Sequence, residues 1–253
     1  MPATLNAIES ELASVLRPEL FNDYCPNGLQ VQGRSQISRL VSGVTACQAL
    51  IDRAVTEGAD MLLVHHGYFW KGEDPTVTGI KRARIQTLLA NQISLFAYHL
   101  PLDVHPQLGN NAQLGKLLGF QVTGEFACYQ GKNIGLLGSL ETACSADQLA
   151  ALVESRLHRM PLVIQGKEAE IRKIAWCTGA AQNYIEEAVA AGADAFVTGE
   201  VSEPTVHIAR ESGICFIAAG HHATERYGVQ ALGHYLAEKF QLQHQFIDVD
   251  NPV

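Results

Sequence analysis

The chain has 253 residues, of which 47% are hydrophobic and 17% are charged, and its formal net charge is −8. This composition is typical of a globular protein with one large domain or two modest ones, and the negative charge disfavours a nucleic-acid partner outside a local basic pocket. The apolar runs fall short of the roughly 18 residues that a membrane span needs, so we expect no membrane partner.

The N-terminal segment and the cysteines both bear on location. Residues 5–16 show the spacing of an amphipathic helix, contain Glu9 and Glu11, and follow no basic segment, which argues against an export signal. The six cysteines include no CxxC pair, which is typical of reduced thiols. These features predict a cytoplasmic protein.

Apolar strands alternate with helices along the whole chain. In chain order, the predicted elements are the helix 5–16, the strand 40–44, the helix 47–57, the strand 61–64, the helix 82–91, the strand 93–98, the helix 146–157, the strand 174–177, the helix 181–191, the strand 195–198, the helix 203–212, the strand 214–219, the helix 224–239 and the strand 245–249. Such alternation predicts an α/β fold built from parallel βαβ units. Gly58 and Gly192 are predicted to end their helices in the left-handed conformation, and Ser145 to cap the helix that follows it.

The pattern also repeats. Residues 37–60 align with residues 171–194 at a constant offset of 134, with nine identical positions. A helix that ends in Gly-Ala-Asp before an apolar strand is common in α/β proteins, but the sustained offset favours an internal duplication. We therefore predict two similar βαβ-containing lobes, residues 1–125 and 126–253, because the polar stretch 119–132 is the best boundary. Residues 224–253 could pack on either lobe.

Imidazoles and carboxylates gather at the predicted strand ends, where parallel α/β sheets bind ligands. His65 and His66 are adjacent and should point to opposite sides of an extended strand, so they serve two ions more easily than one. His221 and Glu225 are four residues apart, which places them on one face of a first helical turn, and Asp103 adds a further oxygen.

A single histidine at a strand end is more often structural than a ligand, but the combination favours metal binding. Mixed nitrogen and oxygen donors suit Zn, Mn, Fe or Co. The prediction is two divalent metal ions per chain, bound by His65, His66, Asp103, His221 and Glu225.

Other side chains lie beside these candidates. His99 and His222 are candidates for catalytic proton transfer, with plain packing as an equal alternative. Phe69 and Trp70 could stack on a substrate base and Lys71 could meet a phosphate, although a subunit contact would also explain this loop.

The motifs VHHGYFWKG, HLPLD, AWCTG, TGEVSE and AGHHATE occur in this order and resemble those of the GTP cyclohydrolase 1 type 2 homologue family, the Nif-three-like proteins, and especially its short bacterial YbgI-type members. The resemblance covers nearly the whole chain. It implies a two-lobed α/β fold, a dinuclear metal centre between the lobes and a homohexameric ring. The family's ligands fall on the same five residues.

Two functions are compatible with these features. The first is a metal-dependent hydrolase of a nucleotide or related small molecule, for which the family name implies opening of the GTP imidazole ring with release of formate. The second is a metal-binding scaffold or regulatory ring without turnover, with a link to DNA-damage protection. Five protein ligands for two ions leave open coordination positions on the metals for water or substrate, which favours the hydrolase.

Overall fold

The structure is a computed structural model that describes residues 2–167 and 170–253. The chain forms two compact units. The first comprises the residues up to Gly109 together with Gly228–Asp250, and the second comprises Asn110–Tyr227 and Asn251–Val253. Within the described residues, no helix is both long enough and apolar enough to cross a bilayer.

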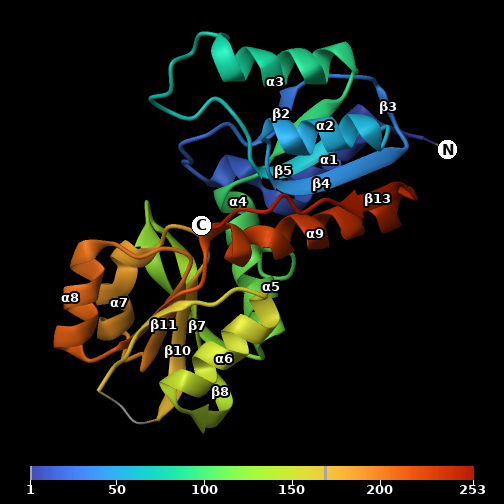
Figure 1. The fold of residues 1–253 in the computed structure, drawn as a ribbon. Coiled ribbons are helices and arrows are strands. Elements are labelled where there is room, and N and C mark those ends of the chain that lie inside the picture. The colour runs from blue at the N-terminus through green and yellow to red at the C-terminus, as the bar shows by residue number, and fades with distance from the viewer. Residues whose placement is uncertain (1, 168–169) are drawn as a thin grey trace. The chain divides into compact units, whose positions relative to one another are not determined.

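The first unit is a five-stranded sheet between two helical layers (Figure 1). Its strands, in spatial order, are β13 (Gln243–Phe246), β4 (Arg39–Thr45), β5 (Met61–His66), β6 (Ser94–Ala97) and β2 (Gly28–Val31). All neighbours pair in parallel except β2, which is antiparallel to β6. The other elements are the strand pair β1 (Ala3–Thr4) and β3 (Gln36–Ile37), the 3-10 turn η1 (Pro18–Leu20), and the helices α1 (Leu5–Leu16), α2 (Gln48–Thr56), α3 (Gly79–Ala90) and α4 (Leu100–Asp103), joined by α9 (His221–Phe240) from residue 228 onward.

The side chains of β5 alternate between the two faces of the sheet, and each face has a hydrophobic core of its own. Leu62 and Val64 face the layer of α2 and α3, whereas Met61 and Leu63 face the layer of α1 and α9. This two-sided burial explains why the strand is apolar throughout.

The second unit contains a six-stranded sheet of mixed parallel and antiparallel strands (Figure 1). Its strands, in spatial order, are β7 (Gln121–Tyr129), β8 (Lys132–Cys144), β10 (Ile171–Cys177), β11 (Ala195–Thr198), β12 (Cys215–Ala218) and β9 (Leu162–Ile164). Its helices are α5 (Asn110–Leu118), α6 (Ala146–Leu157), α7 (Ile185–Ala190) after the 3-10 turn η2 (Gln182–Tyr184), and α8 (Glu203–Ser212). Trp176 is fully buried under α5 and α6, while Phe196 and Phe216 pack on the opposite face with α7 and α8.

The two sheets have four strands in the same arrangement. In each, three consecutive parallel strands (β4, β5 and β6; β10, β11 and β12) are followed in space by an antiparallel strand that precedes them in sequence, β2 or β9. Gly58 and Gly192 follow α2 and α7 with φ of 66° and 73°, so the predicted left-handed helix ends are confirmed. The Ser145 cap is also confirmed, as a capping box with Gln148.

The stretch 119–132 is not a linker. It contains β7, which pairs with β8 through a two-residue turn at Gln130 and Gly131, and both turn residues have the positive φ that such hairpins require. The division between the units instead falls at residues 109 and 110, so the predicted boundary after residue 125 lies inside a strand. The polar composition arises because β7 is an edge strand with exposed side chains.

Candidate metal centre

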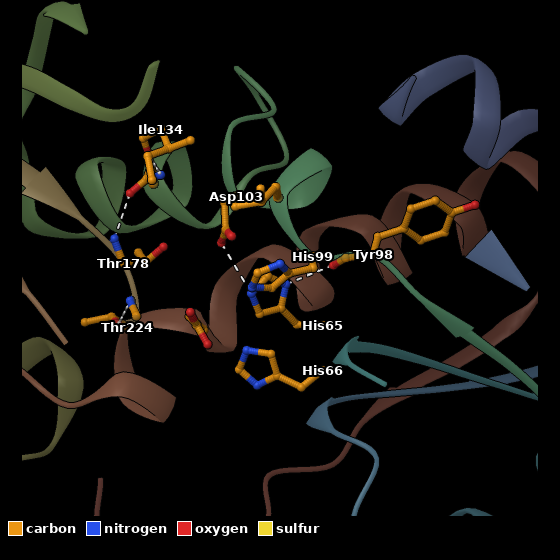
Figure 2. Close-up of polar contacts among 12 residues, drawn as sticks. His65, His66, Tyr98, His99, Asp103, Ile134, Thr178 and Thr224 are labelled. Atoms are coloured by element: carbon orange, nitrogen blue, oxygen red, sulfur yellow. Dashed lines mark hydrogen bonds and ion pairs between the residues drawn. The ribbon is translucent and has the colours of Figure 1, made fainter. Parts of the chain in front are cut away.

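His65 is a fully buried imidazole near the end of β5. Its Nδ1 lies 2.9 Å from the backbone oxygen of Tyr98, which can only accept, so Nδ1 carries a proton and, in the neutral ring, Nε2 carries the lone pair (Figure 2). That Nε2 lies 3.4 Å from Oδ1 of Asp103, at the end of α4. Two acceptor atoms at this separation repel unless a proton or cation lies between them, so the pair fits a metal ion.

His66 is the last residue of β5, and its Nδ1 lies 3.1 Å from the hydroxyl of Thr45 on β4. The ring centroids of His65 and His66 are 4.5 Å apart, and both rings belong to one group of side chains of metal-ligand type. Adjacent strand residues are expected to point to opposite sides, and the two rings nevertheless lie close together.

His99 lies two residues after the end of β6 and forms a buried pair with Asp23. Its Nδ1 is 3.0 Å from Oδ1 of Asp23. Burial alone would raise the pKa of Asp23, but the hydrogen bonds and charge of His99, together with donors from Asn27 and the Leu100 backbone, outweigh burial and lower it. His99 joins His65 and His66 in a group of side chains of metal-ligand type, with ring centroids 5.0 and 5.8 Å away.

The aromatic loop after β5 lies beside these imidazoles. The ring of Trp70 lies 5.2 Å from that of His99, 6.0 Å from that of His66 and 5.7 Å from that of Tyr24. Phe69 instead lies beneath the ammonium of Lys81, at 5.8 Å.

Lys71 is exposed, and its backbone N–H donates to the oxygen of Tyr24. The candidate substrate residues therefore occupy different environments, and Trp70 is the one that borders the imidazoles.

Cys25 is grouped with Asp23 and His99 as a further set of side chains of metal-ligand type. Burial, followed by the negative charges of Asp23 and Asp103, raises the pKa of the Cys25 thiol. A protonated thiol is a poor metal ligand, so this set fits an ion less well than the imidazoles do.

In the second unit, α9 begins at His221 and places Glu225 one turn later, as predicted. Nε2 of His221 lies 3.1 Å from Oε2 of Glu225, and its Nδ1 lies 2.6 Å from Oε1 of Glu200, which follows β11. Burial alone would lower the pKa of His221, but hydrogen bonds and charge from Glu225 and then Glu200 outweigh it and raise the pKa to about 9. A divalent cation could replace that proton beside Glu225.

Glycine allows the close packing of this pair. A Cβ on Gly179 would lie 2.1 Å from Oε1 of Glu225, and a Cβ on Gly199 would lie 2.7 Å from Cα of His221. Gly179 also donates to the hydroxyl of Thr224, which anchors it to the first turn of α9. The backbone after β10 and β11 therefore forms a close-fitting support for both side chains.

His222 is buried, and its backbone N–H donates to the oxygen of Val253. Among the residues that the structure describes, it belongs to no group of side chains of metal-ligand type. A proton-transfer role for His222 therefore has less geometric support than one for His99.

The sequence interpretation missed Asp23 and Asn27 and gave Glu200 no role. Glu200 carried a usable signal, because it follows the strand 195–198 just as the histidine pair follows the strand 61–64. Asp23 carried none, since it lies in an irregular segment 76 residues from His99.

The outer partners of the three candidate ligand histidines follow one rule. Nδ1 of His65, His66 and His221 contacts a carbonyl, a hydroxyl and a carboxylate respectively, which leaves Nε2 as the coordinating atom. Histidine ligands in metal sites are held in this way, and these nitrogen and oxygen donors suit Zn, Mn, Fe or Co.

Comparison with known proteins agrees with the resemblance of the motifs. A protein of Pseudomonas aeruginosa named GTP cyclohydrolase 1 type 2 homolog is 57% identical over 252 residues, covering 100% of each chain. The protein of that name from Escherichia coli K12 is 50% identical, covering 97% of this chain and 98% of its own.

Solved structures agree as well. A protein described as ybgI, of unknown function, has a TM-score of 0.95 at 48% identity and covers 99% of this chain and 100% of its own. A protein from Thermus thermophilus has a TM-score of 0.87 at 31% identity, with the same coverage. The family model of Duf34/NIF3 (NGG1p interacting factor 3) matches residues 3–252, and the chain belongs to this family.

Proposed function

We propose that this protein is a metal-dependent hydrolase with one dinuclear centre, whose ligands are His65, His66, Asp103, His221 and Glu225. The main support is that each of the three imidazoles has its Nδ1 held by an outer partner, which prepares Nε2 for a metal. When bound, divalent ions supply Lewis acidity and lower the pKa of a water to about 7.

The proposed substrate is a nucleotide or a related small molecule, and GTP is the first candidate because the relatives carry the name GTP cyclohydrolase 1 type 2 homolog. Trp70 borders His66 and His99, so it would stack on the base beside the reacting group. In this proposal Phe69 and Lys71 complete the binding loop. His99 would transfer protons, and His222 is the weaker candidate for that role.

The test is to load the purified protein with Zn or Mn and measure formate release from GTP, followed by other nucleotides, phosphoesters and small amides. Glu225→Ala should abolish turnover. Its matched control is Glu203→Ala, which removes a carboxylate from an exposed His–Glu pair of the same i,i+4 spacing, Glu203 with His207 at 2.8 Å. Elemental analysis should give two ions per chain, and saturation at one ion would refute the dinuclear centre.

The same experiment separates the hydrolase from a scaffold. Two tightly held ions that do not exchange, with no turnover on any substrate, would refute the hydrolase proposal. That result would favour a regulatory ring in which the metals are structural. Turnover that survives in Glu225→Ala would point to a contaminating enzyme instead.

We also propose that the chain is cytoplasmic, assembles as a homohexamer and arose by internal duplication. The arrangement of four strands that the two sheets share supports duplication, and the six free cysteines support the location. Assembly rests on the family resemblance, with exposed apolar side chains on α3, Ile80 and Leu89, as surface that another copy would cover. Light scattering that shows a monomer at micromolar concentration would contradict the hexamer.

A further inference from the structure

We infer that Asp23, together with Asn27, is a positioning residue that fixes the orientation and the tautomer of His99. The two residues lie in the irregular segment between η1 and β2, outside every motif that indicated metal chemistry. The inference takes its functional meaning from the proposed hydrolase, but its structural part can be tested without turnover.

The carboxylate of Asp23 accepts hydrogen bonds from four N–H groups. Its Oδ1 accepts from the Tyr24 backbone at 2.7 Å and from the His99 ring at 3.0 Å. Its Oδ2 accepts from the Leu100 backbone and from the Asn27 amide, both at 2.9 Å. The Asp23 side chain is only 2% exposed, so these donors replace water around a buried carboxylate.

Asn27 completes the arrangement. While its Nδ2 donates to Asp23, its Oδ1 accepts the backbone N–H of His99 at 2.7 Å. The backbone and the ring of His99 are therefore both tied to one five-residue segment. Because the ionised Asp23 can only accept, the neutral ring of His99 must carry its proton on Nδ1 and its lone pair on Nε2.

This arrangement matters because His99 lies among the proposed reacting groups. Its ring packs 5.0 Å from His65 and 5.2 Å from Trp70. A lone pair on Nε2 can accept a proton or hydrogen bond from a water or a substrate group, whereas an Nε2–H could only donate. Asp23 thus sets the direction of hydrogen bonding at His99.

An Asp23→Asn substitution should reverse that direction. An amide nitrogen at the Oδ2 position would face two N–H donors, from Leu100 and Asn27, whereas at the Oδ1 position it would face one N–H donor, from Tyr24. The amide nitrogen therefore prefers the Oδ1 position and donates to Nδ1 of His99. The ring must then place its own proton on Nε2.

The experiment is ¹⁵N NMR of histidine side chains at pH 8 in the Zn-loaded protein, with the His99 signals assigned by loss in His99→Gln. The wild type should show the Nδ1–H tautomer for His99, and Asp23→Asn should show the Nε2–H tautomer with unchanged zinc content. The control is Asp52→Asn, an exposed aspartate bonded to Gln48 at 2.8 Å, which should leave the His99 signals unaltered.

The kinetic arm uses GTP and formate release. Asp23→Asn should lower kcat by about 100-fold or more with little change in KM, because the residue acts on proton transfer and not on substrate contact. A wild-type His99 in the Nε2–H form would overturn the inference even if Asp23→Asn did not fold, as would an unchanged tautomer in a folded variant. A wild type without turnover would refute the hydrolase while leaving the tautomer result to decide this inference.

Discussion

Substituting Gly179 by alanine tests whether the backbone after β10 shapes the second half of the proposed metal centre. Gly179 has φ of +69°, and an added Cβ would lie 2.1 Å from Oε1 of Glu225 and 3.2 Å from Nε2 of His221. The backbone has little freedom to move, because the Gly179 oxygen accepts from the Thr198 hydroxyl at 3.1 Å and from the Gly199 N–H at 2.9 Å. The clash must therefore displace the Glu225 carboxylate.

The expected cost has two parts. The left-handed conformation of an alanine costs about 1–2 kcal/mol, and a Glu225 side chain forced off its rotamer adds about 0.5–1.5 kcal/mol. Gly179→Ala should therefore lose about 1.5–3.5 kcal/mol of unfolding free energy in urea denaturation of the metal-free protein. A displaced ligand should also weaken metal binding by at least about tenfold.

Gly192→Ala is the matched control. Gly192 has φ of +73°, and a Cβ there would meet nothing within 4 Å, so this variant carries the backbone strain alone. It should lose about 1–2 kcal/mol and bind metal normally. If both variants lose the same stability and both keep full metal affinity, the close fit of Gly179 against Glu225 has no consequence and the reasoning is refuted.

Three further predictions concern single side chains. Glu225→Ala should lose metal but keep its circular dichroism spectrum, because it opens no cavity in an apolar core, and global unfolding would instead make the metals structural. Burial and the charge of His234 lower the pKa of His244 to about 4, so the unfolded state binds more protons between pH 4 and 6.5 and stability should fall as pH falls through that window. The full shift corresponds to about 3 kcal/mol, which partial exposure of the ring reduces to roughly half, and His244→Gln should flatten the pH profile of unfolding in urea. Asn111→Ala removes the acceptor of the Thr178 N–H, at 2.9 Å, and the donor to the Ile134 oxygen, at 2.8 Å, and should lose about 2–4 kcal/mol in urea, whereas a loss below about 1 kcal/mol would show that other groups replace these bonds.

Elements with a clear local signal could be predicted from the sequence. The helices α1, α6 and α8 begin and end at the predicted residues, because each has an apolar face of helical period and a polar residue before its first turn. The hairpin of β7 and β8 could not be predicted in this way. Its first strand leaves most of its side chains exposed, and a strand without a buried face shows no apolar alternation.

The candidate site also contains residues that the local sequence indicates and residues that it does not. His65, His66, His221 and Glu225 could be found because each lies near the end of an apolar strand. Parallel α/β sheets bind their ligands at the carboxyl ends of the strands. The partners that hold these rings lie far away in sequence. Thr45 and Tyr98 reach the histidine pair only through strand pairing and packing, which no local pattern encodes.

The division of the chain also sets the order in which the protein can be completed during synthesis. The sheet of the first unit begins with residues made early, but its core needs Val229, Leu232 and Leu236 from α9, and its edge needs β13. The sheet of the second unit is complete once β12 has been made. The sheet that is started first is therefore finished last, and until α9 emerges one of its apolar faces is covered by α1 alone, which leaves apolar surface of the kind that chaperones bind.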